Sequence, residues 1–461
     1  MASGCRASGP AHKMQAIRRF QVAVRRKGCR VSRLIFGPLD AVYMSKLKIE
    51  NFGPITTGYA EEDGFIDFQK VTVFIGSQGS GKSSVAKLFS TMSWLEKALF
   101  QGRVTADYIT GDNLFVNEYC AYMNLKSYFR ADTLIEYRGK VGVLRYKQEK
   151  LTVKLHQEST GYRVPKIMYV PAERNFLSAV DEPDKLKGLP SALLEFWEEL
   201  RRAQRETTSS LSLPVSNIRF DYDKSEKIPW LSGKTAGQVD FRLRLSEASS
   251  GFQSLVPLLL VSRNLALTIH KEHDASRSEL SGEERRRLRE QVDAILKANL
   301  PLEVQQEALE SLAARFRRET FLNVVEEPEQ NLFPTSQRAV LYELLSYANT
   351  TPGNELVITT HSPYIINYLT LAIKADEVKR EVAAAPHHAK LRNKLETIVP
   401  DKATLAADST VVYALTSAGT ITRLPMDGGI PSDENDLNNA LGEANAYFSD
   451  LLEIELAAHN A

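Results

Sequence analysis

The chain has 461 residues, too many for one simple hydrophobic core, so its length predicts one large domain with insertions or two domains. Hydrophobic residues make up 43% of the chain and charged residues 25%, proportions typical of soluble globular proteins, which argues against a fibrous or disordered chain. Apolar runs such as Leu255 to Val261 are short, so we expect core segments and no membrane span. The three cysteines lack metal-ligand spacing, and the composition indicates a cytoplasmic protein.

The first 43 residues differ in charge from the rest of the chain. They hold nine Lys or Arg residues and one acid, Asp40, whereas the remainder holds 49 basic and 56 acidic residues. This leader has three interpretations: a basic arm for nucleic acid, a targeting peptide, or translated sequence upstream of a true start at Met44. Arginines interrupt its apolar residues, which argues against a secretory signal. We favour the upstream start, because the predicted fold is complete without the leader.

Alternating strands and helices follow from Met44 onward. In the first half we expect strands at 47–52, 64–68, 71–75, 134–137, 141–146, 151–155 and 167–170, helices at 85–99 and 190–206, and a loop at 207–235. In the second half we expect strands at 239–245, 321–325, 356–360, 411–415 and 420–424, and helices within 252–320, at 336–347 and at 435–452. This order predicts an α/β fold with a doubly wound parallel sheet and antiparallel additions. We divide it into an N-terminal lobe (44–189), a helical insertion (190–320) and a C-terminal lobe (321–461).

A glycine-rich loop between a strand and a helix is the most informative motif. It matches the phosphate-binding pattern G-x-x-x-x-G-K-[ST], and together with the next residue it consists of Gly76, Ser77, Gln78, Gly79, Ser80, Gly81, Lys82, Ser83 and Ser84. Glycines let the backbone approach phosphate oxygens closely, and the following helix adds its positive N-terminus. We expect Lys82 to contact the β- and γ-phosphates of ATP and the Ser83 hydroxyl to bind Mg²⁺.

An acidic pair follows the predicted strand at 321–325. Glu326 is expected to hold Mg²⁺ directly or through water, and Glu327 to orient or deprotonate the attacking water. The alternative is an acidic turn that caps the next helix. His361 stands at the end of the strand at 356–360, where a side chain faces the ligand crevice of such a sheet. We expect His361 to contact the γ-phosphate or the water; a surface histidine without function is the alternative.

A third motif opens the helix that carries Leu255. Ser249-Ser250-Gly251-Phe252-Gln253 places small and polar residues at a helix N-terminus, which is a favourable position for an anion. The alternative is an ordinary helix cap.

Together these motifs resemble ABC-type ATPases, in the branch that includes SMC, RecF-like and OLD-like proteins. The resemblance covers nearly all of residues 44–461 and implies a P-loop ATPase fold with a mixed central sheet, ATP and Mg²⁺ as cofactors, and ATP hydrolysis. It implies that Ser250, Gly251 and Gln253 form the signature motif, which completes the ATP site of a neighbouring subunit. Glu327 matches the catalytic glutamate and His361 the switch histidine. The chain departs from the family pattern at Phe252, which replaces the second glycine of the signature motif.

Two further departures concern acidic and amide residues. Glu326 replaces the usual Asp, and no Gln stands near Glu173 and Arg174, where the family has its Q-loop. The missing Q-loop argues against a transporter subunit. Residues 380–461 are too few to hold a Toprim nuclease, which argues against a self-contained OLD-type enzyme.

Three segments, 47–55, 71–88 and 326–334, look closest to the ATPase subunits (AriA) of PARIS anti-phage systems. That resemblance implies a homohexamer that holds a separate Toprim-family nuclease and releases it when a phage protein is sensed. The alternative is a DNA repair or recombination ATPase of SMC or RecF type. Nucleic-acid binding stays open, because the arginine-rich helix near Arg285 is either a solvated face or a nucleic-acid or partner surface.

Overall fold

The computed structural model describes residues 44–459, apart from 158, 160, 181–184, 216, 235–239, 276–281, 299–300 and 384–387. The basic leader therefore lies outside the described residues, as does Val239 at the start of one expected strand.

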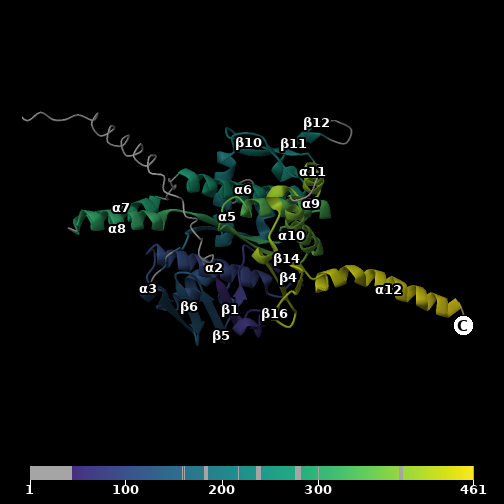
Figure 1. The fold of residues 1–461 in the computed structure, drawn as a ribbon, viewed down its shortest axis with the longest axis horizontal. Helices are drawn as coiled ribbons and strands as arrows, with labels where there is room; N and C mark the ends of the chain where they lie inside the picture. The colour runs from purple at the N-terminus through teal and green to yellow at the C-terminus, as the bar shows by residue number, and fades with distance from the viewer. Residues whose placement is uncertain are drawn as a thin grey trace, which may run out of the picture. The chain divides into compact units, whose positions relative to one another are not determined.

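A seven-stranded mixed sheet forms the centre of the fold, with the strand order β2-β16-β15-β4-β14-β13-β8. In that order its strands are Gly58–Tyr59, Thr420–Arg423, Thr410–Leu415, Val71–Gly76, Glu355–Thr360, Thr320–Glu326 and Pro165–Val170. The five strands from β15 to β8 are parallel, and β16 pairs antiparallel with β15. Every residue of β4 and β13 is buried, as expected for strands covered on both faces. The predicted α/β fold with a parallel core and antiparallel additions is confirmed (Figure 1).

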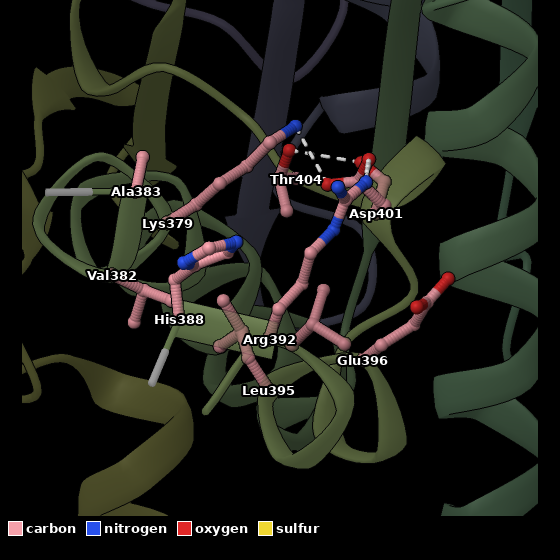
Figure 2. Close-up of a pocket in the computed structure, with 10 residues that line it drawn as sticks. Lys379, Val382, Ala383, His388, Arg392, Leu395, Glu396, Asp401 and Thr404 are labelled. Carbon is pink, nitrogen blue, oxygen red and sulfur yellow. Dashed lines mark hydrogen bonds and ion pairs between the residues drawn. The ribbon is translucent and has the colours of Figure 1, made fainter. Parts of the chain in front are cut away.

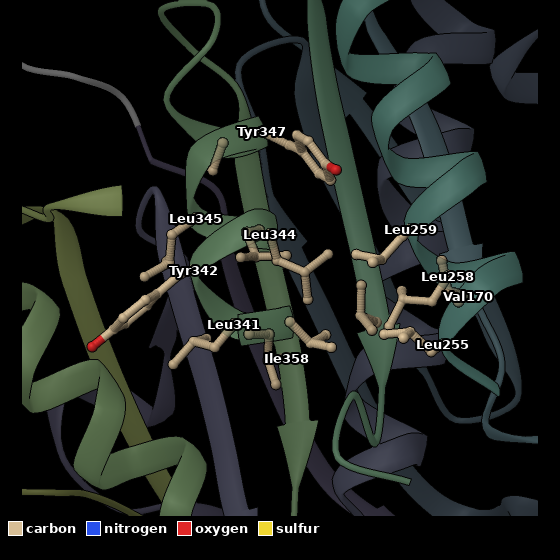
Figure 3. Packing of buried hydrophobic residues seen from close by; sticks show 14 of the residues in the cluster. Val170, Leu255, Leu258, Leu259, Leu341, Tyr342, Leu344, Leu345, Tyr347 and Ile358 are labelled. Atoms are coloured by element: carbon tan, nitrogen blue, oxygen red, sulfur yellow. The ribbon is translucent and has the colours of Figure 1, made fainter. Parts of the chain in front are cut away.

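Two hydrophobic cores cover the two faces of this sheet, because successive side chains of a strand point to opposite sides. On one face, Phe74, Val324 and Val357 pack with helix α2 (Lys82–Phe100). On the other face the sheet packs against α5 (Ser191–Glu206), α6 (Ser250–Ala275), α9 (Pro334–Ala348) and α10 (Pro363–Ala383). Figure 3 shows part of that second core, where leucines of α6 lie near Val170 and leucines of α9 lie near Ile358.

A five-stranded antiparallel sheet, β3-β1-β5-β6-β7, packs over α2. Its strands are Ile66–Asp67, Lys46–Phe52, Phe129–Arg138, Gly142–Lys147 and Lys150–Leu155. Strands β5, β6 and β7 pair in succession, so the β-meander predicted at 134–155 is confirmed. The strand expected at 64–68 is shorter, because a 3₁₀ turn at Glu62–Gly64 precedes β3.

Much of the segment 207–235 consists of strands, so the prediction of a loop there is wrong. Strands β9 (Leu211–Ser212), β10 (Arg219–Asp223), β11 (Ile228–Lys234) and β12 (Asp240–Arg244) form an antiparallel sheet within the region 190–320, which is therefore not wholly helical. Phe220 and Leu231 stand opposite each other in the β10–β11 pair, and both are buried. Such cross-strand pairs stabilise a sheet whose individual strands have little apolar periodicity.

The remaining helices include a pair and a long C-terminal element. Helices α7 (Gly282–Lys297) and α8 (Leu302–Phe316) contact each other as a hairpin, within the region 252–320 where helices were expected (Figure 1). The shorter helices α3, α4 and α11 cover Ala106–Thr110, Phe176–Ala179 and His388–Ile398, and α12 covers Asp436–His459.

Helix α6 is a longer apolar element than the run from Leu255 to Val261 suggested. Its part Ser250–Lys271 is long and apolar enough to cross a membrane by length and composition alone. However, 67% of that window is buried inside the protein, against the central sheet and α9. The burial indicates a core helix, because a membrane span would expose its apolar side chains to lipid.

Candidate functional site

The glycine-rich loop joins the C-terminal end of β4 to the first turn of α2. Gly76, Gly79 and Gly81 have φ angles of 144°, 80° and 103°, which other residues rarely adopt. A Cβ atom at Gly76 would lie 2.2 Å from the main-chain oxygen of Leu415, whereas one at Gly79 would meet nothing within 4 Å. Helix α2 begins at Lys82, so the free amides of its first turn lie next to the loop. The loop is therefore closely packed at Gly76 and has open space at Gly79.

Lys82 forms hydrogen bonds with the main chain of its own loop. Its Nζ atom donates hydrogen bonds to the main-chain oxygens of Gly76 and Ser77, both at 2.8 Å, and the residue is buried. Burial lowers the pKa of Lys82, and the negative charges of Glu327, Glu329 and Glu326 oppose that shift. The lysine thus lies in the field of three carboxylates that come from the end of β13.

Glu326 and Glu327 mark the point where β13 ends. Glu326 is buried, and its Oε2 atom accepts a hydrogen bond from the amide of Ala172 at 3.4 Å, while Oε1 has no hydrogen-bond partner within the described ranges. Glu327 adopts a left-handed φ of 43°, and its amide donates to the main-chain oxygen of Thr359 at 2.9 Å. A non-glycine residue in that region is strained and is held by its surroundings.

His361 follows β14 and faces the same acidic turn. Its Nδ1 atom lies 3.6 Å from Glu327 Oε1 and 3.4 Å from Glu329 Oε1. The Glu327 carboxylate raises the pKa of His361, with a further contribution from Glu329, while burial opposes the shift. In turn, His361 lowers the pKa of Glu327. The pair therefore favours a protonated ring beside an ionised carboxylate.

Glu329 is a site residue that the sequence did not reveal. Its Oε1 atom accepts hydrogen bonds from the Thr360 hydroxyl at 2.7 Å and from the His361 amide at 2.9 Å. Burial raises the pKa of Glu329, and those two hydrogen bonds oppose the shift. The only sequence signal was a third acid in Glu326-Glu327-Pro328-Glu329.

Arg174 is the second residue whose role the sequence did not reveal. The residue is 0% exposed and lies in the 3₁₀ turn Ala172–Asn175 after β8. Its guanidinium donates to four main-chain oxygens: Pro171 at 3.1 Å, Ser254 at 3.2 Å, Glu326 at 2.7 Å and Glu327 at 2.6 Å. Burial lowers the pKa of Arg174 to about 10, so the group remains charged at neutral pH. Arg174 thus ties the first turns of α6 to the turn that carries Glu327.

Ser250, Gly251 and Gln253 contact a different set of segments. Ser250 is exposed at the first position of α6, and Gln253 Nε2 donates to the main-chain oxygen of Ser246 at 2.9 Å. A Cβ atom at Gly251 would lie 2.8 Å from the main-chain oxygen of Asn331. The structure therefore brings Lys82, Glu326, Glu327 and His361 together, and it seats the start of α6 against the turn that follows them.

Several buried oxygen atoms in this region have no hydrogen-bond partner among the described residues. They are Ser80 Oγ, Glu326 Oε1, Glu329 Oε2 and Thr359 Oγ1, and they lie at the ends of β4, β13 and β14 or just beyond them. Among the described residues no group of three or more His, Cys, Asp or Glu side chains could hold a metal ion alone. Mg²⁺ commonly takes one or two protein carboxylates and completes its shell with phosphate oxygens and water. Glu326 and the Ser83 hydroxyl fit that pattern.

A separate cavity of about 240 Å³ lies between α10 and α11 (Figure 2). Asp401 pairs there with Lys379 at 2.6 Å and with Arg392 at 3.2 Å. Lys379 is sixteen residues into α10, roughly 24 Å along the helix from its start near His361. This cavity is therefore distinct from the loop site, and its charges balance each other.

No protein-family model matches the chain, and no curated protein matches it. Solved structures that match include the SMC head bound to the C-winged helix domain of ScpA, at 11% identity and a TM-score of 0.36, covering 84% of this chain and 98% of that one. The SMC head domain from Thermotoga maritima matches at 12% identity and a TM-score of 0.33, covering 71% of this chain and 92% of that one. At such low values, any family or activity has to be argued from the residues of the chain itself.

Proposed function

We propose that this protein binds ATP with Mg²⁺ and hydrolyses it as an ABC-type ATPase of the SMC, RecF-like and OLD-like branch. The observation that carries the proposal is the placement of Lys82 among Glu326, Glu327 and Glu329 at the carboxyl ends of β4 and β13, parallel strands on either side of β14. In open α/β sheets this edge is where ligands bind.

The glycine-rich loop supplies the phosphate site. Its amides and the N-terminus of α2 attract an anion, and Gly79 leaves open space for close approach. Lys82 exchanges its two main-chain acceptors for phosphate oxygens, and Ser80 offers a buried hydroxyl without a partner. Ser83 and Glu326 would hold the cation. When bound, Mg²⁺ supplies charge neutralisation at the phosphate oxygens.

Glu327 and His361 act on the attacking water. A carboxylate with a lowered pKa is a weak base, so the lowered pKa of Glu327 favours the orienting role over proton abstraction. The raised pKa of His361 favours its protonated form, which offers a donor to developing negative charge. Glu329 is a positioning residue, since it holds the main chain of His361.

Ser250, Gly251 and Gln253 would complete the ATP site of a second copy of the chain. Two features support this assignment: the exposure of Ser250 and the placement of α6 against the turn after β13. In a shared site, ATP contacts two subunits at once and so links the subunits of a homo-oligomer. The resemblance suggests that this homo-oligomer is a hexamer.

Mixing two inactive variants tests the shared site. Lys82→Ala removes the phosphate contact, and Ser250→Arg blocks the exposed start of α6. In a random mixture, about a quarter of the sites combine an intact loop with an intact α6 start. ATPase activity should therefore return on mixing. If each variant is inactive alone and the mixture stays inactive while mixed oligomers form, the shared site is wrong.

The role that we propose for this ATPase is a sensor and scaffold of a bacterial anti-phage system in the cytoplasm. It holds a toxic Toprim-family nuclease and releases it when a phage protein is sensed. Its support is the resemblance of segments 47–55, 71–88 and 326–334 to PARIS ATPase subunits. Co-expression with a Toprim nuclease encoded beside it tests the role. The two proteins should co-purify, and a phage trigger should separate them; independent purification with unchanged toxicity would contradict the role.

A DNA repair or recombination ATPase is the second candidate, favoured by one observation. Helix α7 exposes Arg285, Arg286 and Arg289. Phosphate contacts by such residues make binding strongly salt-dependent. Tight binding of duplex DNA at physiological salt, lost when the three arginines are replaced by glutamate, would place this function ahead of the defence role.

A further inference from the structure

A second cavity, of about 340 Å³, lies beside the helix that follows the phosphate loop. Helix α2, the π-helical segment Phe115–Cys120 with the turn after it, strand β8 and helix α5 all contribute to its lining. Ligand pockets range from roughly 300 to 1,000 Å³, so this volume suits a group the size of one long side chain. None of the functions argued above uses this cavity.

Four aromatic side chains line the cavity: Trp94, Tyr119, Tyr122 and Tyr169. The rings of Trp94 and Tyr119 lie with their centroids 5.7 Å apart and their planes at 38°. Trp94 is 37% exposed and Tyr122 is 40% exposed, which is high for such large rings beside a cavity. Aromatic faces carry partial negative charge and attract cations that come within about 6 Å.

The charged groups of the lining are all acidic. Glu118 and Glu195 belong to it, and its other eight residues include no Lys, Arg or His. The Tyr122 hydroxyl donates to Glu195 Oε2 at 3.0 Å, so the carboxylate is held in place. Burial, followed by the charge of Glu195, raises the pKa of Tyr122, which keeps the phenol a neutral donor. Lys87, outside the lining, lies 6.0 Å from the ring centroid of Tyr169.

We propose that this cavity binds a guanidinium or ammonium group on an apolar stem. The aromatic rings would contact the cation and its stem, and Glu195 and Glu118 would supply the counter-charge. Anionic ligands such as phosphates meet two carboxylates here, which distinguishes the cavity from the phosphate loop. The stem would lie along Met123 and Ile167, which complete the apolar part of the lining.

The cavity also lies close to the proposed ATP site. Ser90 and Thr91 of its lining stand on α2, two turns after Lys82. Tyr169 stands opposite Val324 in the parallel pair of β8 and β13, and Val324 is two residues before Glu326. A cation bound in the cavity would therefore lie close to the end of β13, where Glu326 and Glu327 lie.

Calorimetric titration of the full chain with a matched pair of compounds tests the proposal. N-acetyl-L-arginine N-methylamide presents the side chain with a neutral backbone, and the citrulline analogue has the same shape without the charge. The arginine compound should bind at least about tenfold more tightly, as a cation–π contact and an ion pair together would give. Equal affinity of the two compounds, or binding of neither, would overturn the proposal.

Variants assign the binding to this cavity. Glu195→Gln and Trp94→Leu should each weaken the arginine compound by about tenfold, whereas Glu226→Gln, in an exposed turn between β10 and β11, should leave it unchanged. Circular dichroism of each variant confirms the fold. Binding that survives both cavity variants would contradict the assignment.

A third titration, with free L-arginine, identifies the source of the cation. Tighter binding of the free amino acid than of the capped compound indicates a small metabolite. Preference for the capped compound indicates a side chain of a bound protein. Either result supports a cation site.

Discussion

Glu329 Oε1 accepts a hydrogen bond from the main-chain amide of His361 at 2.9 Å and lies 3.4 Å from the Nδ1 atom of His361. One buried carboxylate therefore fixes both the backbone and the ring of the histidine. The Thr360 hydroxyl donates to the same oxygen at 2.7 Å, so the carboxylate itself is held in place. The position of the His361 ring is thus set by its contacts with both Glu329 and Glu327.

Glu329→Gln should leave nucleotide binding nearly intact and slow ATP turnover by about 10- to 100-fold, because the histidine loses part of its positioning. The pKa of His361 should move from its raised value toward the ordinary 6.5, since one of its two carboxylate neighbours loses its charge. NMR titration of the ring and steady-state turnover measure the two effects. Glu377→Gln, a half-exposed position on α10, is the matched control. An unchanged His361 pKa in the Glu329 variant would contradict this relationship.

Glu327→Gln should slow hydrolysis by about 10²-fold while nucleotide binding is kept, because the amide cannot replace the charge that orients the water. The left-handed backbone of Glu327 is held by Arg174 and Thr359, which the substitution leaves in place. Rapid-quench hydrolysis and equilibrium ATP binding separate the two steps. Turnover at the wild-type rate would exclude a role for Glu327 in hydrolysis.

Lys82→Ala should abolish measurable ATP binding, because the loop loses the cation that opposes the charge of the phosphates. The protein should remain folded, since within the described part of the chain the lysine donates hydrogen bonds to the oxygens of its own loop, Gly76 and Ser77. Fluorescent-nucleotide titration measures the loss, and Lys374→Ala on α10 serves as the control. Unchanged ATP affinity in the Lys82 variant would refute the whole site assignment.

Glu355→Gln should change how stability depends on pH. Burial raises the pKa of Glu355 to about 7 from the ordinary 4.5. The folded state therefore retains a proton that the unfolded state loses, and stability declines as pH rises from about 4.5 to 7. The variant removes this decline and should be more stable above pH 7, by at most about 3 kcal/mol. Urea unfolding at pH 4.5 and pH 8 checks it; parallel pH profiles of the two proteins would contradict the raised pKa.

Much of the fold was predictable because its core strands have unambiguous patterns. The β-branched, apolar runs at Val71–Ile75 and Leu356–Thr360 can be buried only in a sheet covered on both sides. The strands at 211–234 were not predictable, because their stability comes from pairs such as Phe220 with Leu231, which only the folded chain brings together.

The candidate site also has residues that could be predicted from the sequence and residues that could not. The loop glycines, Lys82 and the acidic pair follow a local pattern, so the sequence could reveal them. The parts played by Glu329 and Arg174 depend on partners far away in the chain, such as Thr360 for Glu329 and Ser254 for Arg174. Spacing along the chain carries no information about such contacts.

The side chain of Arg174 links three segments of the protein through hydrogen bonds to their main chains. Its rigid, planar guanidinium spans the 3₁₀ turn after β8, the first turns of α6 and the end of β13, and every acceptor is a main-chain oxygen. Substitutions at the side chains of those segments leave the link unbroken, because it is made to the backbone itself. The side chain of Arg174 therefore holds the start of α6 at a fixed distance from the strained backbone of Glu327.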